Sequence, residues 1–264
     1  MNAISFDPVS CIYLAVSAAR SASIPLLDGR IASREVRDSS DRDLKLSADL
    51  QAETVILDHL SKRSKYPVVS EEAYKGENLS EFAGPYWIVD PLDGTYNFGR
   101  KIGFCCVSIA LWSAGEPLLG VVYDFNRDIM YEGVVGCGAY SNGVRIEVAQ
   151  PVKSEQAVLL TGLPVAGDFS TRGIEAFSAR IIRFKKVRLL GSAALSLALV
   201  SSGSSDVYYE RGIRIWDVAA GLALVISAGG CFSVDYCDNE KTICNVSAGS
   251  CIESMRGLNV NYLK

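Results

Sequence analysis

Residues 87–95, which read WIVDPLDGT, constrain the fold of this chain more than any other segment. The β-branched apolar run predicts a buried strand that ends at Asp90, and the proline that follows is expected to end the strand pairing. The turn then directs Asp93 toward the same point. Gly94 and Thr95 open a short helix whose free N–H groups favour an anion such as phosphate. Two carboxylates beside such amides are typical of a metal-dependent phosphoesterase, although a strand followed by a surface turn also fits the segment.

Two further acidic residues follow or begin apolar stretches. Glu71 comes after residues 66–69, so a second strand also ends in carboxylates. Asp217 stands at the start of a strongly apolar helix, where an N-cap is the ordinary role of an Asp. The two roles are compatible, because an Asp at a helix start can direct one oxygen outward. A set of oxygen ligands selects Mg²⁺ or Mn²⁺ over metals that prefer thiolate.

Composition places the chain among ordinary globular proteins. It has 264 residues, of which 49% are hydrophobic and 21% charged, enough for a large core. The formal net charge of −4 argues against a nucleic-acid partner. Residues 1–8 lack the pattern of a signal peptide, and we expect no apolar run of membrane-spanning length. The eight cysteines are scattered without a CxxC pair, which favours reduced thiols and a cytoplasmic protein.

The order of strands and helices changes near residue 150. Residues 105–146 contain strand-like runs with a strong hairpin signal at Asn142-Gly143, which indicates an antiparallel meander. Beyond residue 151, strands and helices alternate, which indicates layered α/β structure. We expect two lobes, residues 1–148 and 149–264, with the polar segment 28–45 as a mobile excursion.

The individual elements follow from apolar periodicity and capping residues. One expected helix begins at Pro8. The others cover residues 48–61, 172–182, 192–201 and 217–228. The expected strands cover residues 67–70, 86–90, 105–112, 118–125, 129–135, 157–161, 186–190, 206–210 and 231–235, followed by a final strand and helix.

The chain resembles the inositol monophosphatase family of Mg²⁺-dependent, lithium-sensitive phosphatases. The matching segments are residues 69–72, 87–98 and 191–221, in the order that the family has. The resemblance implies an α-β-α-β-α sandwich with the site between two lobes. It also implies a Mg²⁺ cofactor, with Mn²⁺ possible, and a homodimer that acts on a small phosphorylated metabolite.

The resemblance further implies a set of metal ligands. Asp90 bridges two metals; Glu71 and the backbone carbonyl of Leu92 complete the first site, and Asp93 and Asp217 complete the second. The attacking water lies on the first metal, which gives Glu71 a catalytic part as well.

Catalytic and substrate-binding residues are implied in the same way. Thr95, paired with Asp49, orients the attacking water and takes part in its deprotonation. The segment before Asp49 reads Lys-Leu-Ser-Ala, where the family commonly has a Val-Thr lead-in. The residues expected to touch substrate are Asp93, Gly94, Thr95, Gly191, Ser192, Ala193, Glu210 and Asp217.

Several alternatives stay open at this point. The tripeptide Tyr96-Asn97-Phe98 favours a monoesterase over a 3′(2′),5′-bisphosphate nucleotidase, which usually has Lys-Glu-Phe there. Fructose-1,6-bisphosphatase and histidinol-phosphate phosphatase activities remain possible, as does an interaction or regulatory protein on a phosphatase fold. The single histidine, His59, excludes a histidine-rich zinc site. Arg211 and Arg214 either are solvated or meet a second anionic group of the substrate.

Overall fold

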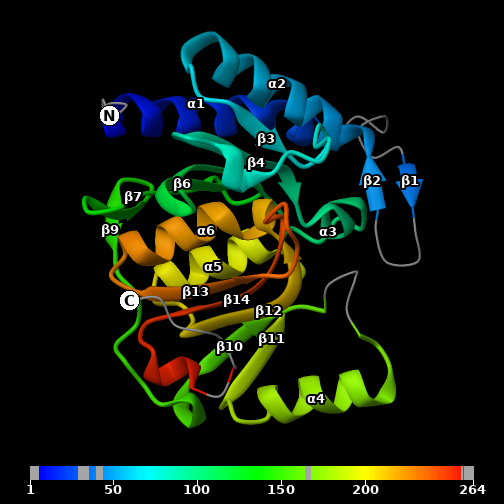
Figure 1. Cartoon of the computed structure of the whole chain (residues 1–264), viewed down its shortest axis with the longest axis vertical. Helices are drawn as coiled ribbons and strands as arrows, with labels where there is room; N and C mark the ends of the chain where they lie inside the picture. Colours follow the sequence, from blue (N-terminus) through cyan, green and yellow to red (C-terminus); the bar gives the residue numbers. More distant parts are fainter. Residues whose placement is uncertain (1–5, 29–35, 40–43, 164–167, 257, 259–264) are drawn as a thin grey trace.

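The protein is built from five alternating layers of helices and sheets in a computed structural model (Figure 1). The structure describes residues 6–28, 36–39, 44–163, 168–256 and 258. Helices α1 (Pro8–Leu27) and α2 (Ser47–Arg63) cover one face of a seven-stranded sheet. Helices α5 (Ala193–Ser201) and α6 (Ile215–Ser227) lie between the two sheets. Helix α4 (Thr171–Ile181) lies outside the five-stranded sheet, so the predicted α-β-α-β-α sandwich is confirmed.

The seven-stranded sheet begins with a parallel pair and continues as an antiparallel meander. Asn142 and Gly143 both have positive φ at the tight β8–β9 turn, as the hairpin signal predicted. In sheet order the strands are β3 (Val68–Ser70), β4 (Tyr86–Asp93), β5 (Cys106–Ser113), β6 (Glu116–Asp124), β7 (Ile129–Val134), β8 (Gly138–Ser141) and β9 (Val144–Ile146). The short helix α3 (Thr95–Gly99) follows β4.

The five-stranded sheet is mixed, as expected where strands and helices alternate. Strands β10 and β12 are parallel, whereas β14 runs antiparallel to both of its neighbours. In sheet order the strands are β11 (Lys186–Leu189), β10 (Val158–Thr161), β12 (Val207–Arg214), β14 (Ile243–Gly249) and β13 (Cys231–Tyr236). Single 3₁₀ turns cover Leu79–Glu81, Ser154–Gln156 and Glu253–Met255.

Three sequence expectations about single elements were wrong, and they concern β4, the final helix and α1. The segment 28–45 contains an antiparallel pair, β1 (Val36–Ser39) and β2 (Leu44–Leu46), while residues 29–35 and 40–43 lie outside the described part. Its mobility stays a prediction. Strand β4 passes through its proline to Asp93, because a bulge absorbs the missing N–H. The expected final helix is only the 3₁₀ turn at Glu253–Met255.

Helix α1 is long and apolar enough to cross a membrane by length and composition alone, contrary to expectation. Asp7 caps it by accepting hydrogen bonds from the N–H groups of Val9 and Ser10. In the most apolar 18-residue stretch of this helix, 44% is buried. Side chains such as Ala15 and Ala19 pack on α2 and the seven-stranded sheet.

Helix α6 ties the two sheets into one hydrophobic core. Its approach to β6 depends on Gly120, because a Cβ there would collide with the carbonyl oxygen of Ala220. Trp112 Nε1 donates a hydrogen bond of 3.2 Å to the carbonyl oxygen of Ala219. This contact fixes the rotation of α6, and with it the direction of its first turn.

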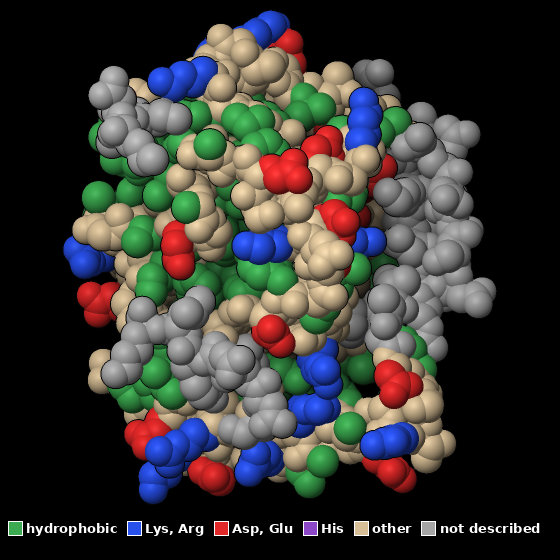
Figure 2. All heavy atoms as spheres, viewed as in Figure 1, with side chains coloured by type: hydrophobic (Ala, Val, Ile, Leu, Met, Phe, Trp, Pro, Cys, Tyr) green, Lys and Arg blue, Asp and Glu red, His purple; other side chains and the backbone are tan. Residues whose placement is uncertain are grey.

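The surface and the cysteines add two simple observations. Figure 2 shows acidic and basic side chains interspersed among hydrophobic ones on this face. All eight cysteines are free thiols, as the scattered spacing predicted.

Candidate active site

Three carboxylates converge where β3 and β4 end. Glu71, Asp90 and Asp217 each offer an oxygen, and these atoms lie within 4.8 Å of one another. Glu71 follows β3, Asp90 lies on β4, and Asp217 lies in the first turn of α6. The strands β3 and β4 are parallel neighbours, so their carboxyl ends meet at one edge of the sheet. The N-cap of α6 is Arg214, so the N-cap role considered for Asp217 is wrong.

A β-bulge shapes the backbone around Asp90. The pairing of β4 with β5 shifts between Asp90 and Asp93, so β4 carries one extra residue there. The N–H of Leu92 donates a hydrogen bond of 2.9 Å to Asp90 Oδ1. This bond fixes the carboxylate of Asp90, which is only 2% exposed.

The electrostatics of the cluster call for a cation. Burial raises the pKa of Asp90 well above its ordinary value, and Glu71 and the neighbouring carboxylates raise it further. The pKa of Asp217 is raised for the same reasons. Ionising all three groups together is costly unless positive charge lies between them. Three hard oxygen donors at this spacing fit a divalent cation such as Mg²⁺.

Asp93 lies beside this group but is directed elsewhere. Its Oδ2 accepts hydrogen bonds from the hydroxyl of Ser192 and, at 2.8 Å, from the N–H of Ala194 at the start of α5. The N–H of Ala193 lies 3.4 Å from Oδ1. Burial raises the pKa of Asp93 to about 6, while these donors oppose the rise. The structure thus joins Asp93 to Ser192 and Ala193, and it leaves Asp93 outside the group of three.

Thr95 connects the bulge to α2. Its Oγ1 lies 3.3 Å from Asp49 Oδ1 and 2.9 Å from the carbonyl oxygen of Leu92. One hydroxyl proton can serve only one acceptor fully at a time, so Thr95 can switch between the two. Asp49 is 4% exposed and holds its place in the first turn of α2.

Gly94 makes the turn before α3 possible. Its φ is +87°, and a Cβ would lie 3.0 Å from the carbonyl oxygen of Phe104 and 3.1 Å from that of Gly191. A side chain is therefore excluded both by the backbone conformation and by close packing. The turn leaves the N–H groups of Gly94 and Thr95 at the beginning of α3, beside the carboxylates.

Sequence reasoning missed Glu53, which is 5% exposed on α2. Its Oε1 accepts hydrogen bonds from the Ser70 hydroxyl at 2.5 Å and the Ala73 N–H at 3.0 Å. These bonds hold the loop that carries Glu71. The available signal was the spacing, because Asp49 and Glu53 are four residues apart and share a helix face.

A cavity of about 690 Å³ opens beside the carboxylates. Glu210 lines it, and burial raises the pKa of this carboxyl to about 7. The hydroxyl of Tyr208 donates a hydrogen bond of 2.8 Å to Glu210 Oε2. Other lining residues are Glu71, Asp93, Gly191, Ser192, Ala193, Arg214, Trp216 and Asp217. Six of the eight expected substrate residues therefore line one cavity together with Glu71, whereas Gly94 and Thr95 do not line it.

The five-layered fold and the acidic cluster beside a cavity supply what a metal-dependent phosphatase of the layered sandwich class needs. The sequence model of the inositol monophosphatase family matches residues 7–256, nearly the whole chain. The chain belongs to the inositol monophosphatase family, and it is a phosphatase.

Individual relatives are similar to this chain over most of their length. The chain is 37% identical over 239 residues to the inositol-1-monophosphatase of Mesorhizobium japonicum, covering 88% of each chain. It is 36% identical over 223 residues to the Nus factor SuhB of Xylella fastidiosa, covering 83% of this chain and 80% of that one. The solved inositol monophosphatase from Anabaena superposes with a TM-score of 0.79 at 29% identity, covering 97% of this chain and 98% of that chain.

Proposed function

We propose that this phosphatase hydrolyses small polyol monophosphates such as inositol 1-phosphate, with Mg²⁺ as its working cation. The observation that carries the proposal is the convergence of Glu71, Asp90 and Asp217 within 4.8 Å beside a cavity of about 690 Å³. A phosphate monoester needs a cation to balance the charge of its phosphate and polar groups to bind its alcohol. The carboxylate cluster supplies a place for the cation, and the cavity supplies the polar groups.

We assign the metal ligands to Glu71, Asp90, the Leu92 carbonyl and Asp217, with Asp93 as a further ligand once its carboxylate turns from α5. The bound cation would stabilise phosphate charge and lower the pKa of a water molecule. Mn²⁺ satisfies the same oxygen donors.

The chain's own residues position the reactants. The Thr95 hydroxyl can accept a proton from the attacking water as it passes its own proton to Asp49 Oδ1, 3.3 Å away. The N–H groups of Gly94 and Thr95 can donate hydrogen bonds to the phosphate oxygens. Glu210, supported by Tyr208, can accept hydrogen bonds from the hydroxyl groups of the alcohol.

We propose that the site joins two lobes, residues 1–148 and 149–264. The first supplies Asp49, Glu71 and Asp90, and the second supplies Glu210 and Asp217. We also propose a cytoplasmic homodimer, which light scattering of the purified protein would test.

A phosphate-release panel tests the substrate class. It contains inositol 1-phosphate, glycerol 2-phosphate, fructose 1,6-bisphosphate, histidinol phosphate and adenosine 3′,5′-bisphosphate. We expect the highest kcat/KM with inositol 1-phosphate. A clear preference for histidinol phosphate or adenosine 3′,5′-bisphosphate would assign the chain to a different activity of the same site.

We further propose inhibition by Li⁺, which can occupy the cation site but carries one charge. Inhibition is expected to be uncompetitive or noncompetitive with substrate. Full activity in high millimolar LiCl would contradict this.

A binding role is the second candidate, because one relative is named a Nus factor. The full set of acidic residues favours catalysis. The variant Asp90→Asn separates the two functions: a cellular phenotype that survives loss of turnover would belong to binding.

A further inference from the structure

A second cavity, of about 410 Å³, adjoins the candidate active site on the side of α4. Its walls come from α4, the end of β10, the middle of β12 at residues 209–212 and Asn245 of β14. Both cavities are lined by Thr161, Gly162, Leu163, Glu210 and Gly212. A ligand can therefore extend from one cavity into the other past Glu210.

Three arginines line this second cavity. Arg172 and Arg180 lie eight residues apart on α4 and share a helix face, while Arg211 lies where the β12–β14 pairing is irregular. None of the three forms a salt bridge with a described residue. Arg180 donates to the carbonyl of Ala176 at 2.9 Å, and Arg211 Nε lies 3.5 Å from Asn245 Oδ1. Each guanidinium has five N–H donors, so most remain available to an anion.

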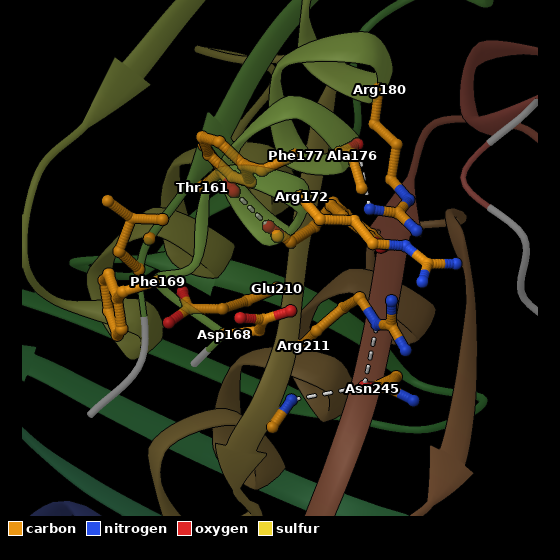
Figure 3. Close-up of a pocket in the computed structure, with 15 residues that line it drawn as sticks. Thr161, Asp168, Phe169, Arg172, Ala176, Phe177, Arg180, Glu210, Arg211 and Asn245 are labelled. Carbon is orange, nitrogen blue, oxygen red and sulfur yellow. Dashed lines mark hydrogen bonds between the residues drawn. The ribbon is translucent and has the colours of Figure 1, made fainter. Parts of the chain in front are cut away.

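The charges in the cavity are separated by sign. Figure 3 shows the guanidinium groups of Arg172, Arg180 and Arg211 on one side, with the carboxylates of Asp168 and Glu210 on the other. Glu210 lines both this cavity and the active-site cavity, whereas Asp168 lines this one. Carboxylates suit hydroxyl groups of a ligand, and guanidinium groups suit its phosphate.

We propose that this arginine cavity is a subsite for a second phosphate group. Its ligand is a sugar or polyol bisphosphate with one phosphate at the carboxylate cluster and the other among Arg172, Arg180 and Arg211. The inference rests on the proposed function, because it takes the carboxylate cluster as the place of hydrolysis. The subsite discriminates between substrates and does not take part in bond breaking.

Two substrates that differ by a single phosphate test the subsite. Fructose 1-phosphate and fructose 1,6-bisphosphate share the same hydrolysable ester, and only the second has the outer phosphate. In Arg211→Ala and in Arg172→Ala/Arg180→Ala, KM for the bisphosphate should rise about 10-fold, because charge-assisted hydrogen bonds are lost. KM and kcat for fructose 1-phosphate should stay within about twofold of wild type. The control is Arg183→Ala, which removes an exposed positive charge just beyond α4 and outside this cavity.

Calorimetry with Asp90→Asn provides a readout that does not depend on turnover. In that background, fructose 1,6-bisphosphate should bind more tightly than fructose 1-phosphate, and Arg211→Ala should remove the difference. If the wild type hydrolyses neither substrate, the proposed function fails while the calorimetric comparison still reports on the subsite. Equal affinities in calorimetry, or equal KM changes for both substrates, would overturn the subsite.

Discussion

The carboxylate cluster and the arginine cavity are neighbours that the chain builds in opposite ways. Asp90 and its partners are short side chains fixed at strand ends or in the first turn of a buried helix. The arginines are long side chains, two of them on α4, which has no buried residue. Charges that must meet a reacting phosphate are held by the core, whereas charges that select a substrate can stand on a surface helix. The difference separates bond breaking from recognition.

The largest effect is expected from the centre of the cluster. Asp90→Asn keeps the size of the side chain but removes the charge that attracts a cation. Turnover should fall by roughly 10³-fold or more, since several kcal/mol of charge stabilisation depend on the metal. Phosphate release and circular dichroism of the same sample measure activity and fold. A folded variant with near-normal turnover would place the chemistry elsewhere.

A smaller effect is expected at Thr95, which contacts Asp49 and the carbonyl oxygen of Leu92 and lies outside the cluster. If its hydroxyl passes a proton to Asp49, Thr95→Ala should lower kcat by roughly 10²-fold, and Thr95→Ser should retain most activity. A purely structural hydroxyl would instead cost about 1 kcal/mol of stability and little kcat. Measuring kcat and melting temperature on each variant distinguishes the two roles.

Glu210 lines both the active-site cavity and the arginine cavity, and its raised pKa makes the free energy of unfolding depend on pH. Burial favours the protonated form, so its contribution to folding is full at low pH and is lost as pH rises through about 7. In EDTA, Glu210→Gln should match wild type near pH 5 and be more stable by about 2–3 kcal/mol at pH 8. Denaturant unfolding at both pH values tests this. A stability difference that does not change with pH would mean that Glu210 ionises as an exposed carboxyl does.

Salt should weaken substrate binding at the arginine cavity more than at the carboxylate cluster. This is the smallest of the four expected effects. Exposed charges are screened within about 10 Å at 0.1 M salt, whereas buried charges are screened much less. Between 0.05 and 0.5 M KCl, KM for fructose 1,6-bisphosphate should rise several-fold more than KM for fructose 1-phosphate. If KM for the two substrates rose in parallel with KCl concentration, both substrates would bind through the same contacts.

The sequence predicted the carboxylates and the alternation of strands and helices because both follow from local patterns, whereas the order of the five layers was implied by the family resemblance. A strand that ends in Asp, followed by Gly94 with its obligatory positive φ, identifies the site without tertiary information. The bulge at Asp90 was not predictable, because it depends on the register of β5. Glu53 was missed because its partners, Ser70 and Ala73, lie far along the chain. The arginine cavity depends on how α4 packs, which no short motif specifies.

The cation dependence of hydrolysis tests whether Glu71, Asp90 and Asp217 hold the cation that hydrolysis needs. Phosphate release from inositol 1-phosphate is measured in EDTA and then with increasing Mg²⁺, for wild type and for Asp90→Asn. We expect no turnover by wild type in EDTA and a saturable rise in the rate of phosphate release as Mg²⁺ is added. The variant should recover little activity at any Mg²⁺ concentration. Equal wild-type rates in EDTA and in Mg²⁺ would contradict a cation site at Glu71, Asp90 and Asp217.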